Sequence, residues 1–428
     1  TVDTYGSYDF TWTEDNNGCT DQDQITVNFY EQPIADAGSG GDECDLDFDL
    51  NATASVGTGT WTSTGPGTAS FAPNANDPNA TVTVTVYGSY DFIWTEVNGT
   101  CTDNDQITVN FYENPTANAG SGGDECDQDF DLNATPSVGT GTWTFTGPGA
   151  AAFAPNANDP AATVTVGAYG TYTFTWTEDN NGCTDQDQIT VNFYEQPIAD
   201  AGAGGSVCGF DFNLGANPTV GTGTWTYSGP GGVTFAPDAN DPNAVATADT
   251  YGSYTFTWTE VNGTCTDADI INVDYLETPV ADAGTGGDEC DLDFDLNATP
   301  SVGTGTWTFT GPGAAAFAPN ANDPNATVTV TAYGSYDFTW TEVNGTCSDN
   351  DQITVNFYEN PTADAGAGGD ECDLDFVLGA TPSVGTGTWT YTGPGIAAFA
   401  PNANDPAATV TVDTYGSYDF TWTEDNNG

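Results

Sequence analysis

The feature that most constrains this chain is the spacing of its ten cysteines. A short gap and a long gap alternate between successive cysteines, so the pattern repeats with a period of about 82 residues. Tryptophans in a GTGTWT context follow the same period. A fixed period of this size indicates a tandem array, in which each repeat is long enough for one small domain. The cysteines are Cys19, Cys44, Cys101, Cys126, Cys183, Cys208, Cys265, Cys290, Cys347 and Cys372.

Prolines at recurring junction motifs, mostly of the form Tyr-Glu-x-Pro, predict the domain boundaries. They give four whole domains at 33–114, 115–196, 197–278 and 279–360, flanked by the partial domains 1–32 and 361–428. Residues 1–18 are identical to residues 411–428, five periods away, whereas the equivalent stretches between them differ. We therefore expect the chain to be an internal piece of a longer protein that carries a five-domain super-repeat.

Within one repeat, apolar and polar residues alternate as they do in half-buried strands. Tyr90, Phe92 and Trp94 fall on one face of a predicted strand, and residues 107–111 alternate in the same way. Gly-Pro-Gly and Asn-Gly turn signals separate these runs, and no segment has a helical period of useful length. About seven short strands in each repeat predict an all-β fold, a tandem array of immunoglobulin-like two-sheet sandwiches.

Two tryptophans of each repeat are predicted to form its core. We expect Trp61 on a central strand and Trp94 facing it from the opposite sheet. A sugar-stacking platform is the alternative role for such residues, but regular inward alternation favours packing.

The charge of the chain excludes several classes of partner. It has 62 acidic residues and no Lys, Arg or His. Nucleic-acid binding and docking to anionic membranes both require basic patches. No apolar run approaches the roughly 20 residues of a membrane span. The expected partners are divalent cations, neighbouring domains of the same chain and identical chains.

The missing residue types also argue against catalysis. Without His or Lys there is no imidazole base and no Schiff-base amine. Paired carboxylates could act in a glycosidase, but that chemistry requires a cleft with substrate-clamping groups. Five near-identical copies of one active site in a row are not expected in an enzyme. We predict a non-catalytic protein that requires no cofactor.

Acidic clusters nevertheless raise the possibility of bound Ca²⁺, which takes six to eight oxygen ligands. Strand alternation places Asp103 and Asp105 on the same face, and the loop at residues 15–18 adds further oxygens. A solvated acidic face is the competing interpretation. If calcium is bound, chelation at low salt should lower the melting temperature. The candidate ligands are Asp15, Asn17, Asp21, Asp23, Asp103, Asp105, Asp185, Asp187, Asp267, Asp269, Asp349 and Asp351.

The strictly spaced cysteines predict disulfides rather than free thiols. Zinc sites are not expected, because no Cys-x-x-Cys pair occurs. We favour pairing within a domain, although the usual strand path places these cysteines at opposite ends of a sandwich. The open alternative joins neighbouring domains, as in a Cys44–Cys183 bond. The favoured pairs are Cys44–Cys101, Cys126–Cys183, Cys208–Cys265 and Cys290–Cys347.

The order of motifs resembles that of a known class of tandem domains. Pro-x-Ala-Asx-Ala-Gly opens a repeat, as at 33–38 and 115–120. A Cys, Gly-x-Trp, Tyr-Gly-Ser-Tyr-x-Phe-x-Trp, Asn-Gly-x-Cys and a closing Ile-Thr-Val strand follow. This order resembles PKD-like/Ig-like domains of large Bacteroidota surface proteins, including type 9 secreted and gliding-associated adhesins. The resemblance implies an extracellular or cell-surface fibre, stalk or filament.

The complete absence of basic residues is not a feature of that family, and it suggests selection for protease resistance or for a salty habitat. Two other functions stay open. One is a Ca²⁺-dependent adhesin whose repeats bind glycan, mineral or neighbouring cells. The other is a sheath or surface-layer subunit whose acidic faces are bridged by cations.

Overall fold

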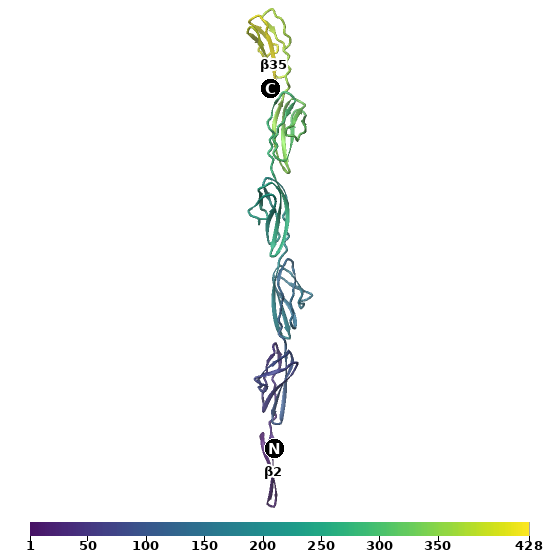
Figure 1. Cartoon of the computed structure of the whole chain (residues 1–428), viewed down its shortest axis with the longest axis vertical. Helices are drawn as coiled ribbons and strands as arrows, with labels where there is room; N and C mark the ends of the chain where they lie inside the picture. The colour runs from purple at the N-terminus through teal and green to yellow at the C-terminus, as the bar shows by residue number, and fades with distance from the viewer. Residues whose placement is uncertain (428) are drawn as a thin grey trace. The chain divides into compact units, whose positions relative to one another are not determined.

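The computed structural model describes residues 1–427, and these residues form strands, turns and loops without any helix. Gly428, the last residue of the predicted domain 361–428, lies outside the described part. Packing divides the chain into two compact units, residues 1–197 with 261–266, and residues 198–260 with 267–428. Each unit is built from small sandwiches that are separated by short linkers (Figure 1).

The sandwich at 33–114 contains seven strands in two sheets. The larger sheet has the order β3-β9-β8-β5, and the smaller sheet has the order β4-β7-β6. This arrangement confirms the predicted two-sheet, immunoglobulin-like sandwich. The strands are β3 (Gly41–Glu43), β4 (Asp47–Asp49), β5 (Thr58–Thr64), β6 (Ala69–Ala72), β7 (Thr81–Val84), β8 (Gly88–Asn98) and β9 (Cys101–Phe111).

The hairpin of β8 and β9 shows why this sequence folds as predicted. The two strands pair along their whole length, from Gly88 opposite Phe111 to Asn98 opposite Cys101. Tyr90, Phe92 and Trp94 are buried on one face, as the alternation predicts. Their burial against the smaller sheet forms the hydrophobic core, and each large aromatic side chain contributes about 2–3 kcal/mol through its removal from water.

The predicted placement of the two core tryptophans is wrong in one respect. Trp61 and Trp94 are both buried, but they lie opposite each other on adjacent strands of the same sheet. Their ring centroids are 5.2 Å apart, and β5 is an edge strand rather than a central one. Alternation along a strand reveals which residues face inward, but it does not reveal which strand is the neighbour.

The other sandwiches repeat this plan with the same sheet orders. At 115–196 the strands are β10 (Gly123–Glu125), β11 (Asp129–Asp131), β12 (Thr140–Thr146), β13 (Ala151–Ala154), β14 (Thr163–Val166), β15 (Gly170–Asn180) and β16 (Cys183–Phe193). At 197–278 they are β17 (Gly205–Cys208), β18 (Asp211–Asn213), β19 (Thr222–Ser228), β20 (Val233–Ala236), β21 (Val245–Ala248), β22 (Gly252–Asn262) and β23 (Cys265–Leu276). At 279–360 they are β24 (Gly287–Glu289), β25 (Asp293–Asp295), β26 (Thr304–Thr310), β27 (Ala315–Ala318), β28 (Thr327–Val330), β29 (Gly334–Asn344) and β30 (Cys347–Phe357).

The two flanking segments contain parts of the same plan. Residues 1–32 form only a hairpin of β1 (Gly6–Asn16) and β2 (Cys19–Phe29), drawn in purple in Figure 1. Residues 361–427 form a three-stranded sheet and a two-stranded sheet. Their strands are β31 (Asp375–Val377), β32 (Thr386–Thr392), β33 (Ala397–Ala400), β34 (Thr409–Val412) and β35 (Asp419–Asp425). The chain as a whole is a tandem array of immunoglobulin-like β-sandwiches that follow the period of the cysteines.

Candidate functional site: the junctions between repeats

In each whole sandwich, a cysteine at the end of the first strand lies close to the point where the last strand ends and the linker to the next repeat begins. β3 runs parallel to β9, with Glu43 opposite Phe111, and the Tyr112 N–H donates a 2.8 Å hydrogen bond to the Glu43 carbonyl. Cys44 therefore lies beside the linker that leads to the next repeat. Cys101 begins β9 at the other end, and an 11-residue strand is about 35 Å long.

Three disulfides join neighbouring repeats. Cys44 bonds Cys183, Cys126 bonds Cys265, and Cys208 bonds Cys347, always across 139 residues of sequence. The Cα–Cα distances are 5.3, 5.5 and 5.6 Å, within the usual range for a disulfide.

The favoured pairing within a domain is therefore wrong, and the alternative between neighbours is correct. The two cysteines of one sandwich lie at opposite ends of a long strand and cannot meet. The hairpin tip of the next repeat instead lies against the end at which Cys44 emerges. The overturned pairs are Cys44–Cys101, Cys126–Cys183, Cys208–Cys265 and Cys290–Cys347.

Four cysteines are free thiols in the described structure. The partner positions that a 139-residue separation would require for them fall outside residues 1–428. The free cysteines are Cys19, Cys101, Cys290 and Cys372.

A hydrogen bond from the hairpin tip to the preceding linker recurs at each junction. The side-chain amide of Asn180 donates to the Glu113 carbonyl at 2.8 Å. At all four remaining junctions the equivalent asparagine amide donates to the equivalent glutamate carbonyl, at 2.8 or 2.9 Å. These bonds are Asn98 to Glu31, Asn262 to Glu195, Asn344 to Glu277 and Asn426 to Glu359.

Glycine at some hairpin tips allows the tip to approach the linker closely. Gly99 has a φ of +64°, and a Cβ added there would lie 2.4 Å from the Tyr30 ring. Gly263 has the same φ and the same close approach to Tyr194. A larger residue would therefore be strained and would clash with the preceding linker. The grouping of residues 261–266 with the unit that contains Glu195 and Cys126 reflects these junction contacts.

Carboxylates hold the first segment of each sandwich in place. The Ala35 and Ala37 N–H groups donate 2.9 Å hydrogen bonds to Asp103 and Asp105, respectively. Both aspartates lie at inward positions of β9, and both accept through Oδ2. Such charge-assisted bonds are stronger than neutral ones. The same pair of bonds recurs at Asp185 and Asp187, at Asp267 and Asp269, and at Asp349 and Asp351.

These aspartates are the predicted calcium ligands, and the structure gives each of them a backbone partner. In the first hairpin, Asp15 accepts from the Gly18 N–H, while Asp21 and Asp23 accept from the N–H groups that directly follow them. Asn17 occupies the turn with a φ of +59°. Within residues 1–427, no three or more Cys, Asp or Glu side chains are arranged to hold a metal ion. Calcium binding stays a prediction.

A buried glutamate lies within each whole sandwich and was not singled out from the sequence. Glu96 is 1 % exposed, and it accepts hydrogen bonds from the Ser55 N–H, the Ser55 hydroxyl and the Trp94 indole. The same hydroxyl accepts from the Ile34 N–H at 2.9 Å, which links the glutamate to the start of the domain. Glu96 continues the inward alternation of Tyr90, Phe92 and Trp94, and that position was the available signal.

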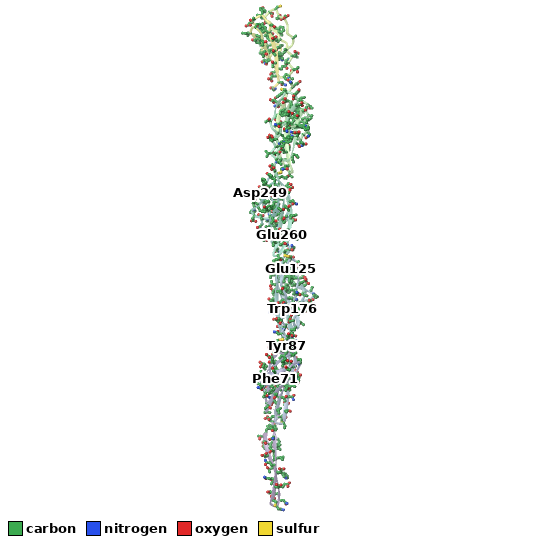
Figure 2. The ribbon with its side chains drawn as sticks, viewed as in Figure 1. Phe71, Tyr87, Glu125, Trp176, Asp249 and Glu260 are labelled. Atoms are coloured by element: carbon green, nitrogen blue, oxygen red, sulfur yellow. A yellow bond between two sulfur atoms is a disulfide. The ribbon has the colours of Figure 1, made fainter. Side chains whose placement is uncertain are left out.

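Hydrogen bonding keeps this glutamate ionised. Burial by itself raises the pKa of Glu96, but the hydrogen bonds from Ser55 and Trp94 outweigh it and hold the pKa below its ordinary value. The pKa of the equivalent glutamate is lowered in the same way in the other whole domains, as in Glu260, which is labelled in Figure 2. The set consists of Glu96, Glu178, Glu260 and Glu342.

Two hollows on the surface lie in the flanking segments. One borders the tip of the first hairpin near Trp12 and Cys19. The other is a groove beside Leu374, Phe376 and Phe420, in the segment that follows the whole domains. The recurring built feature is the junction, which supplies covalent and hydrogen-bonded connections.

Comparison with known proteins gives structural likenesses only, since no protein-family model and no curated protein sequence matches the chain. An I-band fragment of titin, I67–I69, is 13% identical with a TM-score of 0.33, and the match covers 57% of this chain and 98% of the fragment. The eight N-terminal Ig domains of Down syndrome cell adhesion molecule are 11% identical with a TM-score of 0.36, covering 99% and 63%. Drosophila N-cadherin EC1–4 is 12% identical with a TM-score of 0.24, covering 75% and 99%. The fold assignment rests on the sheets and registers described above.

No helix in residues 1–427 is long and apolar enough to cross a membrane.

Proposed function

We propose that this chain is a non-catalytic structural protein that acts outside the cell as part of a long fibre, stalk or filament. The observation that carries the proposal is the disulfide at each of the three interior junctions, which joins each repeat to the next. A spacer needs uniform repetition and firm connections between repeats, and it needs no unique site.

The disulfides also support an extracellular or cell-surface location. Disulfides persist in oxidising compartments and are rare in the cytosol. The bonds here link separate hydrophobic cores, each with its own pair of buried tryptophans, so they are not needed to supply a missing core. Their placement indicates a requirement for connection between domains.

The charge of the chain favours a slender assembly over a bundled one. With 62 acidic residues and no Lys or Arg, identical chains repel one another at neutral pH. Close lateral packing would need bridging cations. A sheath or surface-layer role therefore requires divalent ions, whereas a stalk or single filament does not.

Electron microscopy of the native material tests the proposal through axial spacing and thread thickness. Single threads with a repeat of about 30–40 Å per domain, the length of a sandwich of this size, are expected. Thick bundles or two-dimensional lattices that disperse on chelation would overturn it in favour of a cation-bridged sheath. Imaging with and without EDTA at the same ionic strength separates the two results.

A further inference from the structure

The disulfides and the backbone close loops that overlap. Each disulfide spans 139 residues, but successive disulfides begin only one repeat apart, at Cys44, Cys126 and Cys208. Residues 126–183 therefore lie within the first two loops, and residues 208–265 lie within the last two. Every peptide bond between Cys44 and Cys347 is enclosed by at least one loop.

We propose that the backbone and the disulfides form two separate covalent routes between Cys44 and Cys347, so that tension along the chain is carried by a short route and cannot draw out whole sandwiches between them. The first route passes through the Cys44–Cys183 bond, residues 183–208 and the Cys208–Cys347 bond. The second passes through residues 45–126, the Cys126–Cys265 bond and residues 265–346. The two routes share only their end points.

The two routes exchange roles at successive junctions. At the linker after 33–114, the first route crosses by a disulfide and the second by the backbone. At the linker after 115–196 the roles reverse, and they reverse again after 197–278. Each of these three junctions therefore has two covalent connections, and loss of one leaves the other.

The first route also limits how far the chain can be stretched. It contains only the segment from 183 to 208, whose greatest possible extension is about 90 Å. Without disulfides, the stretch from 44 to 347 could extend to about 1000 Å. Much of the short route is already extended, because β16 and β17 belong to it. Pulling therefore cannot draw out residues 127–182 or 209–264.

Aspartates on the last long strand of the sandwich hold this route against the domain, because they bond the segment that begins the sandwich. Ala199 and Ala201 lie on it, and their N–H groups donate to Asp267 and Asp269 at 2.8 and 2.9 Å. In this proposal the two aspartates attach the short route to the sandwich, which accounts for their inward position better than the role of a solvated acidic face does. The proposal deepens the structural role proposed above and rests on it for its biological use.

The absence of Lys and Arg makes the covalent routes directly testable. In a Glu113→Arg variant, the new arginine is the sole trypsin site, in the linker after 33–114. Free thiols are first blocked with iodoacetamide, and cleavage is run in moderate urea so that the linker is accessible. We expect two fragments on a reducing gel and one undivided species without reductant. Separation without reductant would overturn the proposal, because pairing within domains would leave nothing across the cut.

Matched controls come from the same position in other linkers. Glu195→Arg and Glu277→Arg should behave as Glu113→Arg does, since a disulfide spans each of these linkers. Glu31→Arg and Glu359→Arg should separate even without reductant, because none of the three disulfides spans them. Cleavage in the reducing lane proves in every case that trypsin has acted.

A cysteine variant identifies which disulfide holds a given junction. Adding Cys126→Ser to Glu195→Arg should release the two fragments without reductant. Adding Cys290→Ser, which removes a free thiol, should leave them joined. Release in both variants, or in neither, would contradict the assigned pairing.

Single-molecule pulling from the two ends tests the mechanical consequence. The oxidised chain should show no unfolding steps from residues 127–182 or 209–264. After reduction with dithiothreitol, steps of about 250 Å per repeat should appear, which is the extended length of a repeat less its folded length. Before reduction only the segments outside Cys44–Cys347, such as the flanking residues 361–427, can lengthen freely, so more than one step of that length would overturn the proposal. These covalent and force tests are independent of microscopy, so failure of the filament proposal would not be mistaken for failure of the two routes.

Discussion

The first hairpin and its counterpart in the next repeat have nearly the same sequence in different surroundings. β1 and β2 pair in the same register as β8 and β9, so that Trp12 lies opposite Asp23 as Trp94 lies opposite Asp105. Yet Trp12 is 72 % exposed and Trp94 is 1 % exposed. The register of the hairpin is thus the same in both places, whereas burial of its tryptophan depends on a second sheet that only the whole domain supplies.

The largest difference between the two hairpins should appear when Trp94 and Trp12 are each replaced in separate variants. Trp94→Ala should destabilise the sandwich at 33–114 by about 3–5 kcal/mol, because it deletes a fully packed indole. Trp12→Ala should change stability by less than about 0.5 kcal/mol. Hydrogen exchange with mass spectrometry can follow the peptide around Ile93, which differs from its counterparts in the other repeats. Equal losses of protection would show that burial does not distinguish the hairpins.

The second test adds volume beside the buried tryptophan. A Cβ on Gly59 would lie 1.8 Å from the Trp94 ring, so Gly59→Ala should cost about 2–3 kcal/mol through overpacking. Gly215→Ala is the control, because nothing lies within 4 Å of its added Cβ. Denaturant unfolding compares the two variants. A neutral Gly59→Ala would mean that Trp94 can shift without loss of packing.

The third test concerns the buried glutamate and its dependence on pH. Glu96→Gln should cost about 1.5–2 kcal/mol at neutral pH, because a charged acceptor of buried hydrogen bonds is lost. The pKa of Glu96 is lower in the folded protein, so its contribution is complete above the unfolded pKa, near 4.3, and is lost as the pH falls through the folded pKa. The gap between variant and wild type should therefore shrink below about pH 4.

Measuring the difference between variants removes the effect of general charge repulsion, which weakens as the many other acids become protonated. The control is Glu14→Gln in the first hairpin, where the exposed glutamate accepts from Trp12 but has no serine partner. The effect of Glu14→Gln on stability at neutral pH should be near zero. A constant gap for Glu96→Gln down to pH 3 would contradict a lowered pKa.

The smallest expected effect on stability comes from the β9 aspartates that bond the segment at the start of the sandwich. Asp105→Asn keeps an acceptor for the Ala37 N–H but removes its charge, so we expect a loss of about 1 kcal/mol. The counterpart Asp23→Asn should have little effect, since Asp23 bonds only the N–H of its own neighbour. If calcium chelation lowered the melting temperature of wild type but not of Asp105→Asn, this aspartate would instead be a metal ligand.

Much of the fold could be predicted because its signals are local. The cysteine spacing established the repeat, and the alternation from Tyr90 to Trp94 identified the inward face. The same alternation continues to Glu96, whose inward position was an available signal of a buried group but was not used. Asp103 and Asp105 were assigned to the correct shared face, but their partners Ala35 and Ala37 lie 68 residues away in sequence.

The sequence by itself determined the period, the strand-forming segments and the face that each side chain occupies. These properties follow from spacing and from the two-residue repeat of a strand. Only the tertiary structure decided that Trp61 lies beside Trp94 and that Cys44 bonds the next repeat. Both depend on which strands become neighbours, and β3 must align parallel to β9 before Cys44 reaches the linker. Pairing between strands far apart in sequence is set by the packing of the whole domain, which no single segment encodes.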